Sequence, residues 1–205
     1  MQSIAVLVGL LVAAAVGSPS GIAGKDYADR VARKRTAETV QLIAYGTNIS
    51  GLPIYAGADD LAYVATPAAA ALANLTALTW TIDTTGEDAW TVAPSTNAST
   101  VTPGSLFYIV SSSERGDAFD QAGFVPDASD APAGATTTGF IAYGPYVIVA
   151  ADKVNGTTSY VSEFWARTAP GTDGLWALMW NEANKAHANS APLSIKTTAP
   201  VKSTV

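Results

Sequence analysis

The chain of 205 residues has no cysteine and only one histidine. Without cysteine there are no disulfides, no thiol nucleophile and no cysteine-ligated zinc, so packing and hydrogen bonds must hold the fold alone. A histidine metal site usually needs two or three ligands of that kind. His187 lies in a polar stretch between two predicted strands, which favours an ordinary surface histidine. We therefore expect neither a metal nor a cofactor.

The sequence also lacks the motifs of the common catalytic classes. No G-x-S-x-G nucleophile elbow, dinucleotide-binding G-x-G-x-x-G turn or phosphate-binding loop occurs, and no catalytic residue is assigned. The remaining chemistry is that of carboxylates. They gather at Asp59-Asp60, at Glu87-Asp88, and at Asp117, Asp120, Asp127 and Asp130. A carboxylate pair facing across a sugar would make a glycoside hydrolase and converging carboxylates a calcium site, whereas the acidic composition favours a solvated loop.

Positive charge is scarce and unevenly placed. The chain has 11 basic and 17 acidic residues, a formal net charge of −6, and five of the basic residues fall within residues 25–35. Removal of residues 1–35 would take the net charge to −9, because only two acidic residues leave with them. Nucleic-acid affinity depends on lysine and arginine displacing counterions from phosphates, so we expect neither nucleic acid nor an anionic membrane surface as a partner.

A long uncharged apolar run occupies residues 4–16 and is followed by the small residues Gly17 and Ser18. This pattern predicts a signal peptide over residues 1–18, since the run is shorter than the roughly 20 residues of a membrane-spanning helix. The dibasic pair Lys34-Arg35 predicts a pro-segment over residues 19–35, although a basic linker that is never cut is the alternative. We expect a secreted protein, extracellular or in the cell wall, with no membrane association after signal removal and a single β-domain over residues 36–205.

Four N-x-S/T triplets, the acceptor pattern for N-glycosylation, follow this leader. Their asparagines are Asn48, Asn74, Asn97 and Asn155. A glycan must face water, so each asparagine should mark a surface loop or strand end. Asn74 lies among alanine and leucine and is the site we expect to be left unoccupied.

Alternation of apolar and polar residues dominates the rest of the sequence and predicts short strands separated by glycine and proline turns. The predicted strands are residues 39–45, 61–65, 78–83, 105–110, 138–143, 147–151, 159–167, 175–181 and 193–198. This organisation predicts an all-β antiparallel sandwich, with a β-barrel as the alternative. Residues 67–75 have helical propensity and form either one short helix or an alanine-rich loop.

Two further segments have distinctive composition. Residues 128–138 contain only small residues and nothing that would anchor them in a core, which predicts a mobile loop. The tetrapeptide Ile-Ala-Tyr-Gly begins at Ile43 and again at Ile141, 98 residues later. The flanking residues do not match, which favours chance recurrence over two structural halves.

Residues 159–181 predict a hairpin, because two apolar strands flank a loop with Pro-Gly and Asp-Gly turn signals. In its second strand Trp176 and Trp180 point to one side, and both sides of the strand are apolar. The favoured interpretation is that a second layer of the domain covers them, as in a central strand. The alternative is an exposed glycan-binding platform of two indoles about 13 Å apart, widened by Trp165 on the neighbouring strand.

Several segments resemble small secreted proteins of filamentous fungi, which are mostly uncharacterised and in part associated with the cell wall. They are residues 42–46 (LIAYG), 51–53 (GLP), 58–64 (ADDLAYV), 175–181 (LWALMWN) and 192–195 (PLSI). The resemblance covers most of residues 40–200 and carries no catalytic residue. The dibasic pro-segment is similar to fungal maturation, whereas the absence of cysteine departs from many secreted fungal effectors.

Together these features predict a secreted, N-glycosylated, non-enzymatic protein that is structural or glycan-binding at a cell wall or host surface. A cell-wall polysaccharide is the expected partner. The alternatives are a carbohydrate-active hydrolase using a carboxylate pair and a protein-binding effector that acts through residues 117–130. The sequence does not predict an oligomeric state.

Overall fold

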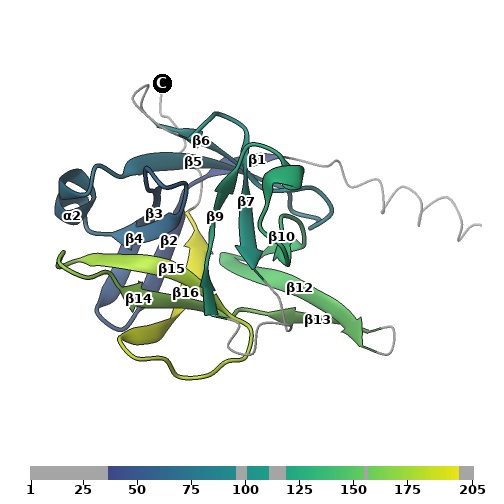
Figure 1. Cartoon of the computed structure of the whole chain (residues 1–205). Helices are drawn as coiled ribbons and strands as arrows, with labels where there is room; N and C mark the ends of the chain where they lie inside the picture. The colour runs from purple at the N-terminus through teal and green to yellow at the C-terminus, as the bar shows by residue number, and fades with distance from the viewer. Residues whose placement is uncertain (1–36, 96–100, 111–118, 155–156, 199–205) are drawn as a thin grey trace, which may run out of the picture. The chain divides into compact units, whose positions relative to one another are not determined.

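A computed structural model describes residues 37–95, 101–110, 119–154 and 157–198, without the side chains of residues 151–154 and 157 (Figure 1). The predicted signal peptide and pro-segment, residues 1–35, lie outside this part of the chain, as do Asn97, Asp117 and Asn155. Strands account for 56% of the structure and helices for 6%. The predicted all-β antiparallel class is therefore confirmed.

Six antiparallel strands close into a barrel. In ring order they are β3 (Ile49–Ala56), β4 (Ala62–Ala65), β15 (Leu175–Asn181), β14 (Phe164–Thr168), β16 (Ser190–Thr197) and β2 (Leu42–Gly46). The ring closes at β2, where Ile43 lies opposite Pro53 of β3 on one side and opposite Lys196 of β16 on the other. Alternate residues such as Ala44, Ile54 and Leu178 point inward and are at most 2% exposed. The two predicted architectures were a sandwich and a barrel, and the central strands form the barrel.

A second antiparallel group extends from the barrel, because β5 pairs with β3 at Tyr55 and Ala77. It contains β1 (Glu38–Val40), β5 (Thr76–Ile82), β6 (Thr91–Pro94), β7 (Ser105–Val110), β9 (Gly123–Val125) and β10 (Ala135–Thr136). The short strand β8 (Phe119–Gln121) pairs with β15. The inward residues of the second group, such as Trp80 and Phe107, belong to the same buried cluster as the barrel interior, so one continuous apolar core serves both layers.

Aromatic side chains fill the junction between these layers. Phe107 lies between Trp80 and Phe140, with ring centroids 5.1 and 5.0 Å away, and Phe140 also packs on Trp90 at 5.7 Å. All four are at most 1% exposed. Edge-to-face and tilted contacts of this kind add to the burial of apolar area, and they provide cohesion in a chain that has no cysteine and therefore no disulfides.

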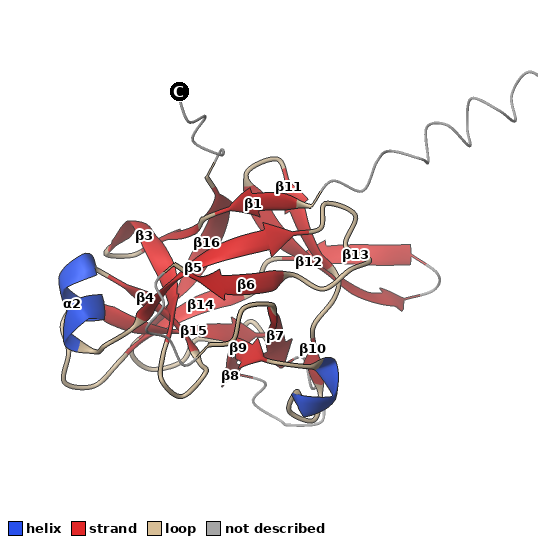
Figure 2. Cartoon of the chain, turned by 90° about the horizontal axis from the view of Figure 1, so that it is seen from above, coloured by secondary structure: helices blue, strands red, loops and turns tan. Residues whose placement is uncertain are grey.

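Three strands continue from the barrel on the side of β16. They are β11 (Phe140–Tyr143), β12 (Tyr146–Val154) and β13 (Thr157–Val161), joined to the barrel where Tyr146 lies opposite Lys196. In both views β12 and β13 reach out beyond the barrel strands (Figures 1 and 2). Each of β11 and β13 pairs only with β12, so this three-stranded arm presents one broad outer face.

Each predicted strand contains residues that form a strand in the structure, but two of the predicted strands each correspond to two separate strands. Residues 159–167 form two strands: Tyr160 belongs to β13 and pairs with β12, whereas Trp165 belongs to β14 and pairs with β15. Residues 39–45 are likewise divided between β1 and β2. The hairpin prediction is confirmed for β14 and β15. Strands β3, β6, β8, β9 and β10 were not predicted, because they are short or, in β3, interrupted by Gly51 and Pro53.

Within the described residues the α-helix is α2 (Pro67–Leu72), which shows that the alanine-rich segment forms a helix. Thr66 caps it by accepting a hydrogen bond from the Ala69 amide at 3.2 Å, and proline occupies the first turn, where no amide donor is needed. The prediction for residues 128–138 was wrong. Asp127 caps a 3₁₀ turn over Ala128–Asp130, and Ala131 and Ala135 pack on a buried cluster that contains Tyr108.

Candidate functional site

The tryptophans do not form the platform that was the alternative interpretation of the sequence. Trp180 is 2% exposed and packs edge-to-face on Phe164 at 5.0 Å, inside the barrel. Trp176 is half-buried against the same core. Trp165 lies opposite Met179, which places it on the other face of the sheet, where it is 8% exposed. The favoured interpretation of a covered strand is therefore the correct one.

The exposed aromatic residues lie instead on the outer face of the β11–β13 arm. Tyr143, Tyr160 and Tyr146 are 73%, 58% and 45% exposed, and among the described residues they are three of the four large hydrophobic side chains that lie in solvent. Tyr143 and Tyr160 form an open groove of about 410 Å³ with Ile141 and Ile148. Apolar residues gathered in one open groove are typical of a binding surface, whereas scattered ones are not.

The strand register explains why these side chains meet. On β12 the odd-numbered Val147 and Val149 point into the core, so Tyr146, Ile148 and Ala150 point outward. Ile141 lies opposite Ile148 on one side of β12, and Tyr160 lies opposite Ala150 on the other side. The groove therefore has an aliphatic floor along β12 and a tyrosine at each wall.

A cation-π clamp continues this face toward the barrel. The Lys196 ammonium lies 4.7 Å from the ring centroid of Tyr45 and 4.8 Å from that of Tyr146. Tyr146 is the direct strand neighbour of both Lys196 and Tyr143, so the clamp and the groove share one row of side chains. Both Ile-Ala-Tyr-Gly segments contribute to this face, through Tyr45 on β2 and Tyr143 on β11.

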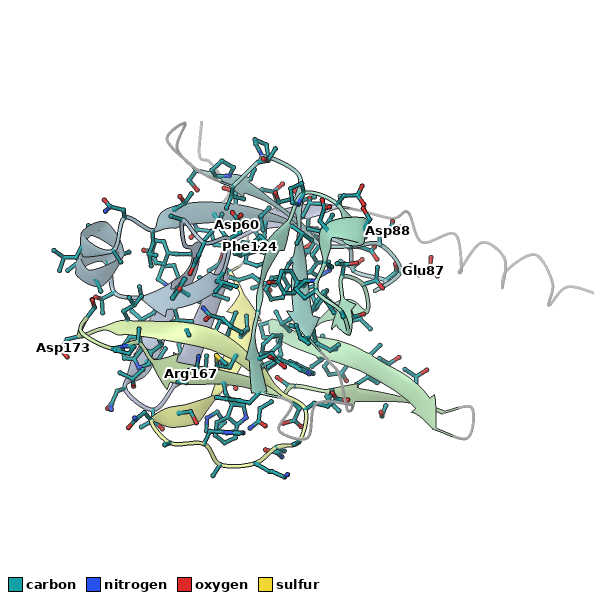
Figure 3. All side chains as sticks on the ribbon, in the orientation of Figure 1. Asp60, Glu87, Asp88, Phe124, Arg167 and Asp173 are labelled. Atoms are coloured by element: carbon teal, nitrogen blue, oxygen red, sulfur yellow. The ribbon has the colours of Figure 1, made fainter. Side chains whose placement is uncertain are left out.

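An acidic loop contacts the groove at Ile141. A Cβ atom at Gly86 would lie 2.7 Å from Cγ1 of Ile141, so the backbone of this loop touches a side chain of the groove. The Gly139 amide also donates to the Gly86 carbonyl at 3.0 Å, which ties the loop to the start of β11. The next residues are Glu87 and Asp88, both exposed (Figure 3).

Asp83 holds this loop in shape. Its carboxylate is 8% exposed and accepts hydrogen bonds from the Thr85 hydroxyl and from the amides of Glu87 and Asp88 at 3.0 and 3.1 Å. Burial opposes ionisation, but the hydrogen bonds outweigh it and lower the pKa of Asp83. The Trp90 indole donates to the Asp83 carbonyl at 2.9 Å. This buried carboxylate therefore has a structural role.

The other predicted carboxylates are dispersed. Asp59 accepts a 2.7 Å hydrogen bond from Tyr63, whose pKa is raised by burial and then by this bond and the charge of Asp59. Asp127 caps the 3₁₀ turn, and its bonds from the amide and hydroxyl of Ser129 lower its pKa. Asp120 is on β8, opposite Trp180. Within the described ranges no three acidic or histidine side chains are grouped so as to hold a metal ion.

His187 is half-buried rather than freely exposed. Its ring stacks on Phe119 at 3.9 Å with an interplanar angle of 6°, and Arg167 lies 5.7 Å from the centre of the same phenyl ring. The histidine therefore packs as part of an aromatic cluster below β15. Its Nε2 atom is buried and has no hydrogen-bond partner among the described residues.

The structure describes two of the four glycosylation asparagines. Asn48 occupies the turn between β2 and β3, and Asn74 follows α2; both are exposed and have positive φ angles of 61° and 52°. Asparagine tolerates this backbone conformation better than most residues. Both side chains are thus placed where a glycan could be accommodated.

Comparison with protein-family models, curated proteins and solved structures finds no match. In the described part of the chain no helix has the length and apolarity needed to cross a membrane. Fold and site together define a small antiparallel β-barrel with an aromatic groove on an attached three-stranded arm. The groove was not predicted from the sequence, although residues 146–151 (YVIVAA) are apolar on both faces of the strand, as β15 is.

Proposed function

We propose that this protein is a secreted, non-enzymatic glycan-binding protein that acts at a cell wall or host surface through the Tyr143–Tyr160 groove. The observation that carries the proposal is the groove itself, in which two solvent-exposed tyrosines flank an aliphatic floor. Tyrosine offers a rigid apolar ring face together with a polar hydroxyl, and sugars present apolar C–H faces edged by hydroxyls. The two surfaces match in shape and in polarity.

The shape of the groove favours an extended ligand. It is open along the outer face of the arm, and each wall comes from a different strand, so a chain can enter and leave without threading a cavity. The three strands of the arm are held by the main core through Phe140 on β11, Val149 on β12 and Val161 on β13. A rigid platform loses little conformational entropy when it binds, which is the advantage of placing the walls on strands.

The test uses the full chain secreted from a eukaryotic host. The protein is co-sedimented with insoluble chitin, β-glucan, cellulose and xylan, and the supernatant is assayed for released sugar. We expect retention without release. The double variant Tyr143→Ala/Tyr160→Ala should weaken retention at least tenfold, equivalent to about 1.4 kcal/mol, with an unchanged circular dichroism spectrum.

Leu72→Ala is the matched control, because Leu72 is an 80% exposed apolar residue on α2, away from the arm. It should leave retention unchanged. Retention that survives the double tyrosine variant would refute the groove as the binding site. Release of sugar, lost when a single carboxylate is changed to its amide, would favour the hydrolase alternative, and absence of retention on every polysaccharide would favour a protein partner.

A further inference from the structure

We infer that the groove selects a cationic amino-sugar polymer, that is, a glycan with free primary amines. This inference rests on the proposed glycan-binding function and adds the chemical class of the sugar. Three observations carry it: an ammonium already bound by tyrosines on the same face, two further tyrosines that form the groove, and acidic residues in the loop that contacts it.

The Lys196 clamp shows how this face holds an ammonium. Its Nζ atom lies between the rings of Tyr45 and Tyr146 at nearly equal distances, 4.7 and 4.8 Å. Such an interaction contributes most where the cation is partly removed from water. Lys196 itself is half-buried, so the clamp meets that condition.

The groove also contains two tyrosine rings, but no lysine among the described residues lies between them. Tyr143 and Tyr160 present rings on either side of Ile148, and none of the four residues that line the groove is cationic. Their exposure of 73% and 58% leaves the ring faces accessible. Tyr143 lies opposite Tyr146 and Tyr160 lies opposite Ala150, so an ammonium on a sugar ring would lie against one of these two rings, as Lys196 lies against Tyr146, while the carbon skeleton covers the aliphatic floor.

The negative charges of the protein favour a cationic sugar over an anionic one. Glu87 and Asp88 follow Gly86, whose backbone contacts Ile141 of the groove. The whole chain carries a net charge of −6, which attracts cations and repels polyanions. The positive charge of Lys196 opposes this attraction of cations near the groove. It lies beyond Tyr146, two strand spacings or about 10 Å from Tyr143, a separation at which salt already screens exposed charges at physiological ionic strength.

The experiment compares glucosamine and N-acetylglucosamine oligomers of equal length by isothermal titration calorimetry with the full chain. The two ligands share one backbone and differ in the charge at nitrogen. At about pH 5.5 the sugar amines are protonated, and exposed carboxylates, with reference pKa values near 4, stay ionised. We expect at least tenfold tighter binding of the glucosamine oligomer and a preference that shrinks as salt is raised.

Two matched double variants locate the charge. Glu87→Gln/Asp88→Asn should reduce the preference three- to fivefold and leave binding of the acetylated oligomer unchanged. Asp130→Asn/Asp173→Asn removes the same charge from exposed positions elsewhere, with Asp173 on the opposite side of the molecule from Glu87 (Figure 3), and should leave the preference intact.

Equal binding of the two oligomers, or tighter binding of the acetylated one, would overturn the inference. If Tyr143→Ala/Tyr160→Ala still abolished that binding, the proposed glycan-binding function would stand. A preference that both charge variants reduce equally would refute the role of the acidic loop. Binding of neither oligomer overturns the inference, and the co-sedimentation assay then decides independently whether any glycan binds.

Discussion

Replacement of Trp180 by alanine should lower the stability of the domain without acting on a binding surface. The indole is 2% exposed and packs on Phe164 in the barrel interior. A tryptophan buries about 150–250 Å², which at about 25 cal/mol per Å² gives an upper limit of roughly 4–6 kcal/mol. Measured tryptophan-to-alanine changes in cores cost about 3–5 kcal/mol.

One feature of the site reduces this cost. The Trp180 indole nitrogen is buried and has no hydrogen-bond partner in the structure, and an unsatisfied buried donor costs about 1–3 kcal/mol. Truncation removes that donor together with the ring. We therefore expect Trp180→Ala to lower the free energy of unfolding by about 3 kcal/mol, and Trp180→Phe to cost less than about 1.5 kcal/mol, since it keeps a ring and also removes the donor.

Urea denaturation followed by circular dichroism and by the fluorescence of the remaining tryptophans measures both changes. With a slope of about 2 kcal/mol/M, the alanine variant should shift the midpoint by about 1.5 M. A loss below about 1 kcal/mol, combined with weaker retention on polysaccharide, would refute the burial of Trp180 and restore the indole platform. Trp180→Phe as damaging as Trp180→Ala would show that the indole nitrogen has a partner.

The remaining predictions concern the acidic loop and the helix. Because the pKa of Asp83 is lowered in the folded state, its ionised form stabilises the fold above the unfolded-state pKa of about 4, and this contribution is lost as pH falls through the folded-state value. Thermal denaturation should therefore show a stability loss on acidification that is smaller in Asp83→Asn, and equal pH dependence in the two proteins would contradict the role of Asp83. At neutral pH, Asp83→Ala should cost about 1–3 kcal/mol by leaving the Glu87 and Asp88 amides without their acceptor. Thr66→Ala should cost about 1 kcal/mol through loss of the helix cap and Thr66→Ser close to nothing, as checked by urea unfolding; an equal loss in both variants would point to a packing role for the Thr66 methyl group.

The sequence predicted the strands that alternate cleanly and are bounded by turn residues. Strand β15 was predicted instead from a run of six apolar residues between Gly174 and Asn181, and both its faces pack on buried clusters. Strand β3 was missed, since Gly51 and Pro53 signal a turn locally, whereas pairing with β2, β4 and β5 holds the chain extended. Tertiary pairing overrides propensity in such cases.

The prediction for residues 128–138 was wrong for a related reason. Small residues do not anchor a loop by themselves, but Ala131 and Ala135 fit against Tyr108 and its neighbours, which supply the bulk. A small side chain becomes partly buried when a larger side chain on a neighbouring strand packs against it. That partner is on β7, and its position depends on the pairing of the whole outer sheet.

The sequence by itself determined the all-β class and the antiparallel hairpin of β14 and β15, because alternation and turn residues act over a few neighbouring positions, whereas it left residues 67–75 open between a helix and a loop. Only the tertiary structure decided which apolar faces are covered. Trp180 and Tyr143 both lie on strands with two apolar faces, yet the barrel closes over one and leaves the other in solvent. The exposure of a side chain depends on pairing between strands far apart in the chain, such as that of Tyr146 with Lys196. A pattern of neighbouring residues does not predict that pairing.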